Sequence, residues 1–250
     1  MKKNLIYIGV LMMLASCGAN QQYTVSSVTG ERVLVTPTDH PDIGMLELVS
    51  HYKAKLDREM NVVIGESDDY MPFGKPESLL TNFTSDVMML LDTKYTEGTK
   101  PDLTVMNVNG HRAPMPEGDI TVGDLFEVYS FDNELAVVKL KGSDLLDLFD
   151  SYAKMGGSGI SSNVRLIISK DGKLIDAKVN GKPVDKDKIY TVVTLDYLAE
   201  GNDGMDAFKK SLSVYKPGII LRDYMIEYVK SQTEKDKDIS SELDGRITVQ

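Results

Sequence analysis

The stretch from Gly181 to Gly204, GKPVDKDKIYTVVTLDYLAEGNDG, decides the predicted fold of this 250-residue chain. Its β-branched centre, residues 190–194 (YTVVT), predicts a strand. Soon after the strand comes the loop at residues 199–208 (AEGNDGMDAF), which crowds glycines, an amide and acids into a few positions. Such a loop is a chain-reversing turn, an acidic calcium loop or part of a ligand site.

The calcium interpretation is the weakest of the three. An EF-hand loop needs acidic or amide side chains at alternating positions, followed by a glutamate at a fixed distance. Asp203 and Asp206 are three positions apart, and no glutamate follows at the required place. A turn and a ligand site remain open at this point.

Outward from this stretch, strand-like and helix-like segments share one chain. The pattern predicts an α+β (mixed α/β) fold, a single domain over residues 23–250 with a mixed sheet and flanking helices. Thr121, with Asp124 three residues on, and Ser143 are the expected helix N-caps. Strands are predicted at 61–65, 102–106, 134–140 and 244–249, and hairpins at 23–36 and at 164–179, the latter from strands 164–169 and 173–179. Helices are predicted after Pro41 and at 77–95, 143–152, 205–212 and 218–230.

The N-terminus has the pattern of an export signal. Lys2 and Lys3 precede an apolar run of about ten residues, too short to cross a bilayer. Leu14-Ala15-Ser16-Cys17 resembles a bacterial lipobox, which predicts a lipoprotein signal peptide at 1–16, a lipidated Cys17 and a tether at 17–22. We then expect the protein in the cell envelope, anchored to the membrane by lipid on the periplasmic side. An ordinary signal peptide with a chance cysteine is the alternative.

The amino-acid composition limits which kinds of molecule we expect this chain to bind. Cys17 is the only cysteine, so no internal disulfide can form. The formal net charge is −10 and becomes more negative by two if the leader is removed. A chain this acidic does not attract polyanions, so nucleic acid is not an expected partner. A small anion can still bind where a local cation overrides the background.

Several kinds of catalytic centre are missing from the sequence. His40, His51 and His111 are the only histidines, they are widely separated, and no metal-binding histidine motif is present. There is no G-x-S-x-G elbow and no Gly-rich phosphate or dinucleotide loop. We therefore expect no catalytic residues, no bound metal and no cofactor in this chain.

Six segments, in order, carry a family resemblance. They are 77–86 (ESLLTNFTSD), 107–112 (NVNGHR), 118–121 (GDIT), 128–135 (VYSFDNEL), 181–204 and 244–247 (DGRI). Together they resemble the C-terminal, substrate-binding domain of the 5′-nucleotidase family, whose patterns include N-G-G-G-I-R, P-F-x-N-x-L and F-L-A-x-G-G-D-G. Each segment alone is weak, but the ordered set spans residues 60 to 248 and is specific.

The resemblance implies a fold and a role. In that family an N-terminal metallophosphoesterase domain carries two metals and the catalytic residues, and the C-terminal domain holds the nucleoside. This chain resembles only the second domain, so the divalent metals are expected on a separate metallophosphoesterase chain. By position, Phe131 and Tyr197 match the two aromatic residues that sandwich the base in the family. Arg112 matches the family's arginine near the ribose and phosphate, and Asp203 matches the acid that accepts hydrogen bonds from the ribose hydroxyls. Asn107 can donate to a base nitrogen.

Each of these residues also has a structural interpretation, and the motifs have departures. The aromatics could be core residues, and the polar residues could be surface or turn residues. Val108, Asn109 and His111 replace two glycines and an apolar residue of the arginine motif, and Asn202 replaces a glycine. Tyr197 replaces a phenylalanine but keeps the ring face. Lys75 and Pro76 stand where the family often has a further arginine.

Three functions follow from these residues. The first is the nucleoside- or nucleotide-binding half of a split 5′-nucleotidase, which presents a nucleoside monophosphate to the other chain for phosphate ester hydrolysis. The second is a nucleotide-binding envelope lipoprotein without catalysis. The third is a structural lipoprotein that has lost the site. Whether the chain is part of an enzyme is left open, and alone it is expected to be inactive.

Overall fold

The computed structural model describes residues 25–34 and 42–250, and these divide between two units. The signal peptide, Cys17 and the tether predicted at 1–22 lie outside the described residues. Within the first unit, Met1–Leu46, the described residues 25–34 are exposed and form no strand. The predicted hairpin at 23–36 is therefore wrong. An isolated two-stranded hairpin is at best marginally stable in water.

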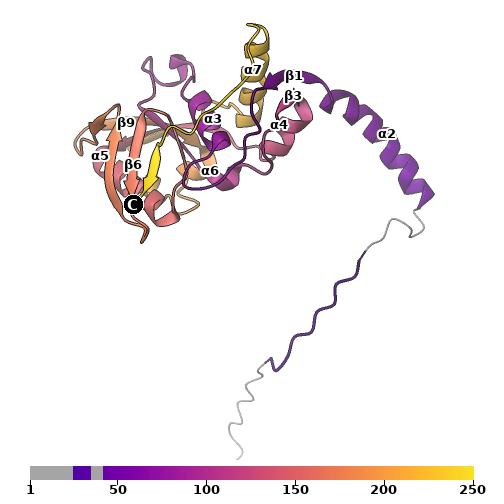
Figure 1. The fold of residues 1–250 in the computed structure, drawn as a ribbon, viewed down its shortest axis with the longest axis horizontal. Coiled ribbons are helices and arrows are strands. Elements are labelled where there is room, and N and C mark those ends of the chain that lie inside the picture. The colour runs from indigo at the N-terminus through magenta and orange to yellow at the C-terminus, as the bar shows by residue number, and fades with distance from the viewer. Residues whose placement is uncertain (1–24, 35–41) are drawn as a thin grey trace, which may run out of the picture. The chain divides into compact units, whose positions relative to one another are not determined.

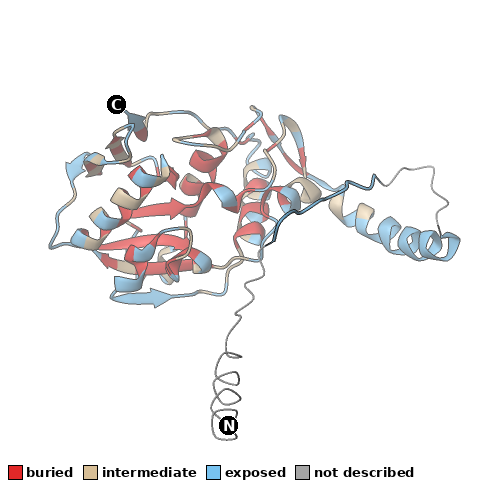
Figure 2. Ribbon diagram, turned by 90° about the horizontal axis from the view of Figure 1, so that it is seen from below, coloured by how far each residue is buried: buried red, intermediate tan, exposed pale blue. Residues whose placement is uncertain are grey.

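The second unit, Glu47–Gln250, is built around a five-stranded mixed sheet. The strand predicted at 190–194 is β9 (Ile189–Leu195), which lies at the centre of this sheet. It is antiparallel to β4 (Leu135–Lys141) and parallel to β2 (Leu103–Met106). Six of its seven residues are buried, which explains its continuous apolar run. Figure 2 shows the same burial along the central strands. The strand order is β10 (Ser213–Tyr215), β4 (Leu135–Lys141), β9 (Ile189–Leu195), β2 (Leu103–Met106) and β5 (Gly159–Ile160).

The remaining strands form two smaller sheets. The predicted hairpin at 164–179 is confirmed as β6 and β7, which pair antiparallel, and β11 adds parallel to β6. The four-stranded sheet has the order β11 (Ile247–Val249), β6 (Val164–Ile168), β7 (Leu174–Val179) and β8 (Lys182–Pro183), and a two-stranded sheet joins β1 (Val63–Ser67) to β3 (Gly118–Thr121).

Helices other than α2, which has no buried residue, cover these sheets, as the predicted α+β class requires. The helix α5 packs against β4 and β9 of the central sheet and against β7 of the four-stranded sheet. Figure 1 shows α4 and α7 gathered with β1 and β3 at one end of the unit. The helices are α2 (Ile43–Met60), α3 (Leu79–Met88), α4 (Val122–Val128), α5 (Gly142–Met155), α6 (Asp196–Ala199) and α7 (Leu221–Thr233), with 3₁₀ turns η1 (Thr93–Tyr95), η2 (Val108–Gly110) and η3 (Asp206–Lys210).

The N-termini of α4 and α5 show whether Thr121 and Ser143 are the N-cap residues that the sequence predicts. Thr121 begins α4 as expected: its hydroxyl accepts from the Asp124 amide at 3.1 Å, and the Asp124 carboxylate accepts from the Thr121 amide at 2.7 Å. Ser143 is not an N-cap, because α5 already begins at Gly142. The Gly142 amide donates to the Lys188 carbonyl at 2.8 Å. A Cβ at Gly142 would lie 1.8 Å from the Asp185 carbonyl oxygen, so glycine permits this close approach.

The helix predicted at 77–95 is shorter in the structure. The helix α3 ends at Met88, and a separate 3₁₀ turn follows at 93–95. Leu91 is buried while Leu90 is exposed, so the chain leaves the helical path to return Leu91 to the core. The Asp92 side chain then accepts from the Lys94 amide at 2.9 Å and caps the new turn.

Candidate binding cavity

The site forms where two parallel strands end. Leu103 pairs with Val192 and Thr104 with Val193, so β2 and β9 run in the same direction side by side. The carboxyl ends of neighbouring parallel strands meet at one edge of a sheet, which is where such folds commonly bind ligands. Asn107 follows β2 at this edge, and Tyr197 lies in the first turn of α6, directly after β9.

A cavity of about 260 Å³ lies at this edge, and all five predicted binding residues line it. Sequence reasoning missed three further lining residues. Asn109 and Gly110 belong to the 107–112 motif and Asn133 to the 128–135 motif, so the same motifs could have indicated them. The complete lining is Asn107, Asn109, Gly110, Arg112, Phe131, Asn133, Tyr197 and Asp203.

The two aromatic rings are half exposed. Phe131 is 48% exposed and Tyr197 41%, whereas core aromatics such as Phe149 are fully covered. The Arg112 guanidinium lies 5.6 Å from the centre of the Phe131 ring, within cation–π range. Among the described residues no carboxylate forms an ion pair with Arg112. The cavity therefore offers open aromatic surface beside a guanidinium that has no anionic partner within the described chain.

Asp203 receives a hydrogen bond on each carboxylate oxygen. Asn107 Nδ2 donates to Oδ2 at 2.7 Å, and the Tyr197 hydroxyl donates to Oδ1 at 3.1 Å. The hydrogen bond to Asp203 and the charge of its carboxylate raise the pKa of Tyr197 above its usual value. Asp203 has a φ of +52°, in the left-handed region, which aspartate tolerates better than most residues. Asn202, next to it, donates to the Tyr197 carbonyl at 2.8 Å and folds the loop back on the ring.

The amide of Asn107 is tightly held. Its Oδ1 is buried and has no hydrogen-bond partner, while its Nδ2 faces Asp203. A Cβ at Gly110 would lie 2.6 Å from this Oδ1, so a side chain there would displace the amide. Gly110 is thus needed for the observed position of Asn107.

His111 lies behind the cavity and is buried. Its Nε2 is 2.8 Å from the Thr84 hydroxyl, which is itself 2.7 Å from the Tyr129 hydroxyl. Burial lowers the pKa of His111 to about 4, so the ring is neutral near pH 7. The histidine that departs from the family motif is therefore an internal support of the loop that carries Arg112.

The segment around Phe131 is held by α7. The Leu221 amide donates to the Asn133 carbonyl at 2.9 Å, and Arg222 forms an ion pair with Asp132 at 2.5 Å. The Arg222 guanidinium also donates to the Tyr129 carbonyl at 3.2 Å. No local pattern could pair Arg222 with a residue 90 positions away, so sequence reasoning missed this support.

The departure at Lys75 and Pro76 lies away from this cavity. Lys75 donates to the Met155 carbonyl at 2.7 Å and does not line the cavity.

Within residues 25–34 and 42–250, no group of three or more His, Cys, Asp or Glu side chains could hold a metal ion. No helix in the described part of the chain is long and apolar enough to cross a membrane.

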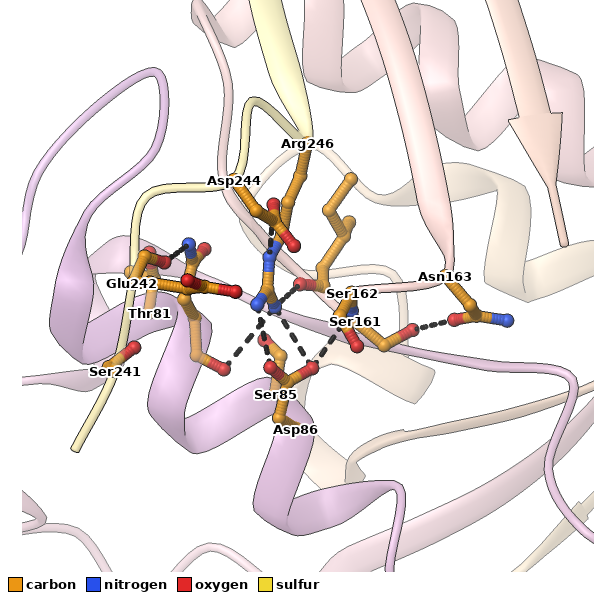
Figure 3. A network of polar contacts seen from close by, with 12 residues as sticks. Thr81, Ser85, Asp86, Ser161, Ser162, Asn163, Ser241, Glu242, Asp244 and Arg246 are labelled. Atoms are coloured by element: carbon orange, nitrogen blue, oxygen red, sulfur yellow. Dashed lines mark hydrogen bonds and ion pairs between the residues drawn. The ribbon is translucent and has the colours of Figure 1, made fainter. Parts of the chain in front are cut away.

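A larger cavity of about 930 Å³ is lined by a different set of residues, and its buried arginine, Arg246, is already paired. Figure 3 shows Arg246 at the centre of a network of hydrogen bonds and ion pairs. Its guanidinium donates to Asp86 at 2.6 and 3.0 Å, to Asp244 at 3.1 Å and to the Ile160 carbonyl at 2.9 Å. This network joins α3, the end of β5 and the C-terminal strand, and we interpret it as structural.

Comparison with known proteins identifies the family of this chain. The model of the family described as 5′-nucleotidase, C-terminal domain, matches residues 63–210. The chain belongs to this family. Its resemblance, its fold class and the position of the cavity loops between residues 107 and 203 are consistent with that membership.

Three relatives place the chain within the family. It is 27% identical to protein UshA of Escherichia coli over 210 residues, which cover 82% of this chain and 38% of UshA. It is 27% identical over 188 residues to the NAD 5′-nucleotidase of Haemophilus influenzae, covering 65% of this chain and 31% of that protein. The crystal structure of a 5′-nucleotidase precursor from Thermus thermophilus matches with a TM-score of 0.70 and 26% identity, covering 88% of this chain and 46% of that one. The chain thus spans less than half the length of the relatives it matches.

Proposed function

We propose that this chain is the nucleoside- and nucleotide-binding half of a split 5′-nucleotidase. One observation carries the proposal: two half-exposed aromatics, a carboxylate and a guanidinium line a single cavity at the ends of β2 and β9. The relatives with similar sequences include 5′-nucleotidases. The ligand we expect is a nucleoside monophosphate or its nucleoside.

Each part of such a ligand has a matching group. A base can stack on Phe131 and Tyr197, and stacking on an aromatic ring is worth about 1–3 kcal/mol per base with little dependence on its identity. The ribose hydroxyls can donate to Asp203. Arg112, which has no acidic partner among the described residues, can donate hydrogen bonds to the phosphate in this acidic chain. The cavity therefore suits nucleotides of more than one base.

Hydrolysis is assigned to a second chain. The protein covers only 38% of UshA, and no metal-binding cluster is present within the described ranges. A metallophosphoesterase chain would supply a dinuclear metal centre, and binding of the nucleoside here would orient the phosphate towards it. Lipidation of Cys17, which lies outside the described residues, would hold the complex on the periplasmic side of the cell envelope.

Two experiments test this proposal. Calorimetric titration of the purified chain with AMP and with adenosine should show saturable binding, and the absence of binding at millimolar ligand would reject it. Co-expression with a metallophosphoesterase that lacks this domain should then give AMP hydrolysis that neither chain shows alone.

The same experiments separate the alternatives. A chain that binds AMP but forms no complex and adds no activity is a nucleotide-binding lipoprotein without catalysis. The described residues, among which no metal-binding cluster is found, also fit that role. A chain that binds neither ligand is a structural envelope lipoprotein.

A further inference from the structure

The helix α2 carries an apolar face that is uncovered among the described residues. Leu48, Val49, Tyr52 and Leu56 are each at least 50% exposed, and α2 contains no buried residue. Because an α-helix has 3.6 residues per turn, these four side chains lie on one side of it. They line one continuous patch of surface, which we call the α2 face. A contiguous exposed apolar patch of this kind marks an interaction site.

The C-terminal end of α2 is fixed to the unit that contains the cavity. The Val122 amide, at the start of α4, donates to the Val62 carbonyl at 3.0 Å. A Cβ at Gly123 would lie 3.2 Å from the Met60 carbonyl oxygen, so the end of α2 contacts the start of α4 closely. The α2 face belongs to this same unit, Glu47–Gln250. A molecule bound to the α2 face would therefore be attached to the unit that contains the cavity.

Electrostatic charge argues against two possible occupants of the α2 face. A second copy of this chain would bring together two molecules of formal net charge −10, which repel each other. Helices that lie on a membrane surface are rich in lysine and arginine on the polar face. Between residues 47 and 60, however, three acidic residues balance three basic ones. A protein partner with an apolar groove fits better, and Lys55, which forms no ion pair among the described residues, is free to pair with an acid of that partner.

The place of α2 in the family indicates which protein this partner is. The family model begins at residue 63, just after α2 ends at Met60. The match to UshA covers 82% of these 250 residues, so at most about 45 residues precede it, and the α2 face lies within it. Because the matched family is a C-terminal domain, the larger, unmatched part of UshA joins it on its N-terminal side, where α2 lies. The α2 face is thus at the boundary with the part of the relatives that this chain does not match.

We propose that the α2 face is the docking surface for the metallophosphoesterase chain of the split 5′-nucleotidase. This inference rests on the proposed function and adds where the two chains meet. Leu48, Tyr52 and Leu56, spaced one turn apart, enter an apolar groove of the partner, and Lys55 pairs with an acidic side chain at the rim of that groove. No residue of the α2 face lines the cavity, so docking leaves the cavity free to exchange nucleotides.

The test compares two sides of one helix. The face variant, Leu48→Asp/Leu56→Asp, places two charges on the α2 face. The matched control, Ser50→Asp/Ala54→Asp, places two charges at exposed positions on the opposite side of α2. Circular dichroism and thermal unfolding verify that each variant is folded. The partner used is the metallophosphoesterase chain whose co-expression with the wild type gives AMP hydrolysis.

We expect both variants alone to bind AMP within about twofold of the wild type, because none of the four positions lines the cavity. In calorimetric titration with the purified partner, the face variant should lose affinity by about tenfold or more. Its two leucines no longer contribute apolar burial, and the new carboxylates would have to leave water. The control should bind the partner within about twofold of the wild type. AMP hydrolysis with the face variant should return towards the wild-type rate as the partner concentration is raised.

Three results would overturn this inference and leave the proposed function standing. The first is a face variant that binds the partner as tightly as the control does. The second is a wild-type chain that sediments alone as a dimer and is dissociated by the face variant, because a second copy would then cover the α2 face. The third is binding to phosphatidylglycerol vesicles that only the face variant loses, because a membrane would then cover it.

Failure of the proposed function gives a different result. In that case no metallophosphoesterase chain hydrolyses AMP together with the wild type, and this inference fails with the proposed function.

Discussion

Arg222, at the start of α7, forms an ion pair with Asp132, the neighbour of Phe131, with 2.5 Å between Nη2 and Oδ1. The arginine is buried, and its guanidinium also lies 4.1 Å from the centre of the Phe126 ring. A side chain outside the cavity thus determines where the aromatic segment inside it is held.

Replacing Arg222 by methionine should weaken the fold and the cavity together. The Tyr129 carbonyl would lose a donor, and leaving a buried polar group unpaired costs about 1–3 kcal/mol. We expect a loss of that size in urea unfolding and a several-fold lower affinity for adenosine. Lys230→Met on the same helix is the control, because Lys230 is exposed. An unchanged adenosine affinity in a destabilised Arg222 variant would show that α7 does not position Phe131.

Removing the ring of Phe131 should affect binding far more than stability. The side chain is half exposed, so Phe131→Ala should change the free energy of unfolding only slightly. The loss of one stacking partner should lower the affinity for both AMP and adenosine by about tenfold or more. Tyr70→Ala, at an exposed position that does not line the cavity, should leave both affinities unchanged. Equal affinities in wild type and Phe131→Ala would rule out stacking on this ring.

His111 should make stability depend on pH below neutrality. Its pKa is about 4 in the folded chain and about 6.5 when exposed, so the unfolded chain binds more protons between these values. The neutral ring therefore contributes stability that is fully present above about pH 6.5 and is lost as the pH falls towards 4. The expected total is about 3 kcal/mol.

Urea unfolding at pH 7, 6, 5 and 4.5 measures this contribution. His111→Leu cannot titrate, so its stability should fall less over this range than that of the wild type, by about 2.5 kcal/mol at pH 4.5. His51→Asn, which changes an exposed histidine on α2, should follow the wild type. If the stability of wild type and of His111→Leu fell equally with pH, the lowered pKa of His111 would be contradicted.

Arg246 should contribute more to stability than an exposed cation outside the cavity. Its side chain is 2% exposed and holds Asp86, Asp244 and the Ile160 carbonyl. Arg246→Met removes a donor from the buried Ile160 carbonyl and leaves Asp86, which is 38% exposed, without its partner, and should cost about 1–3 kcal/mol. Lys178→Met breaks an exposed pair with Asp176 and should cost less than about 1 kcal/mol. Similar losses in the two variants would show that the network in Figure 3 adds little.

Much of the fold could be predicted because its signals are local. The Thr121–Asp124 capping box, the hairpin at 164–179 and the buried strand β9 each depend on residues a few positions apart. The predictions were wrong where contacts between residues far apart in the sequence decide where an element begins or ends. The helix α5 begins at Gly142 because carbonyls from the 185–188 turn satisfy its first amides, and no pattern near Ser143 records that contact.

The cavity residues were predictable for a different reason. Asn107, Arg112, Phe131, Tyr197 and Asp203 came from ordered motifs, and the structure brings all five to one cavity. Their supports, such as Arg222 and Thr84, were not predicted because they act through single long-range contacts. The roles of the five residues in binding stay predictions until a ligand is titrated.

The parallel pairing of β2 with β9 also sets when the cavity can exist during synthesis. Asn107 and Asp203 are 96 residues apart and meet only when the strand that precedes Tyr197 has joined the sheet. Contacts of such long sequence separation form late, after much of the chain has been ordered. A fragment that ends before β9 would contain Arg112 and Phe131 but would lack the other wall of the cavity. Nucleotide binding would thus report that folding has incorporated residue 203.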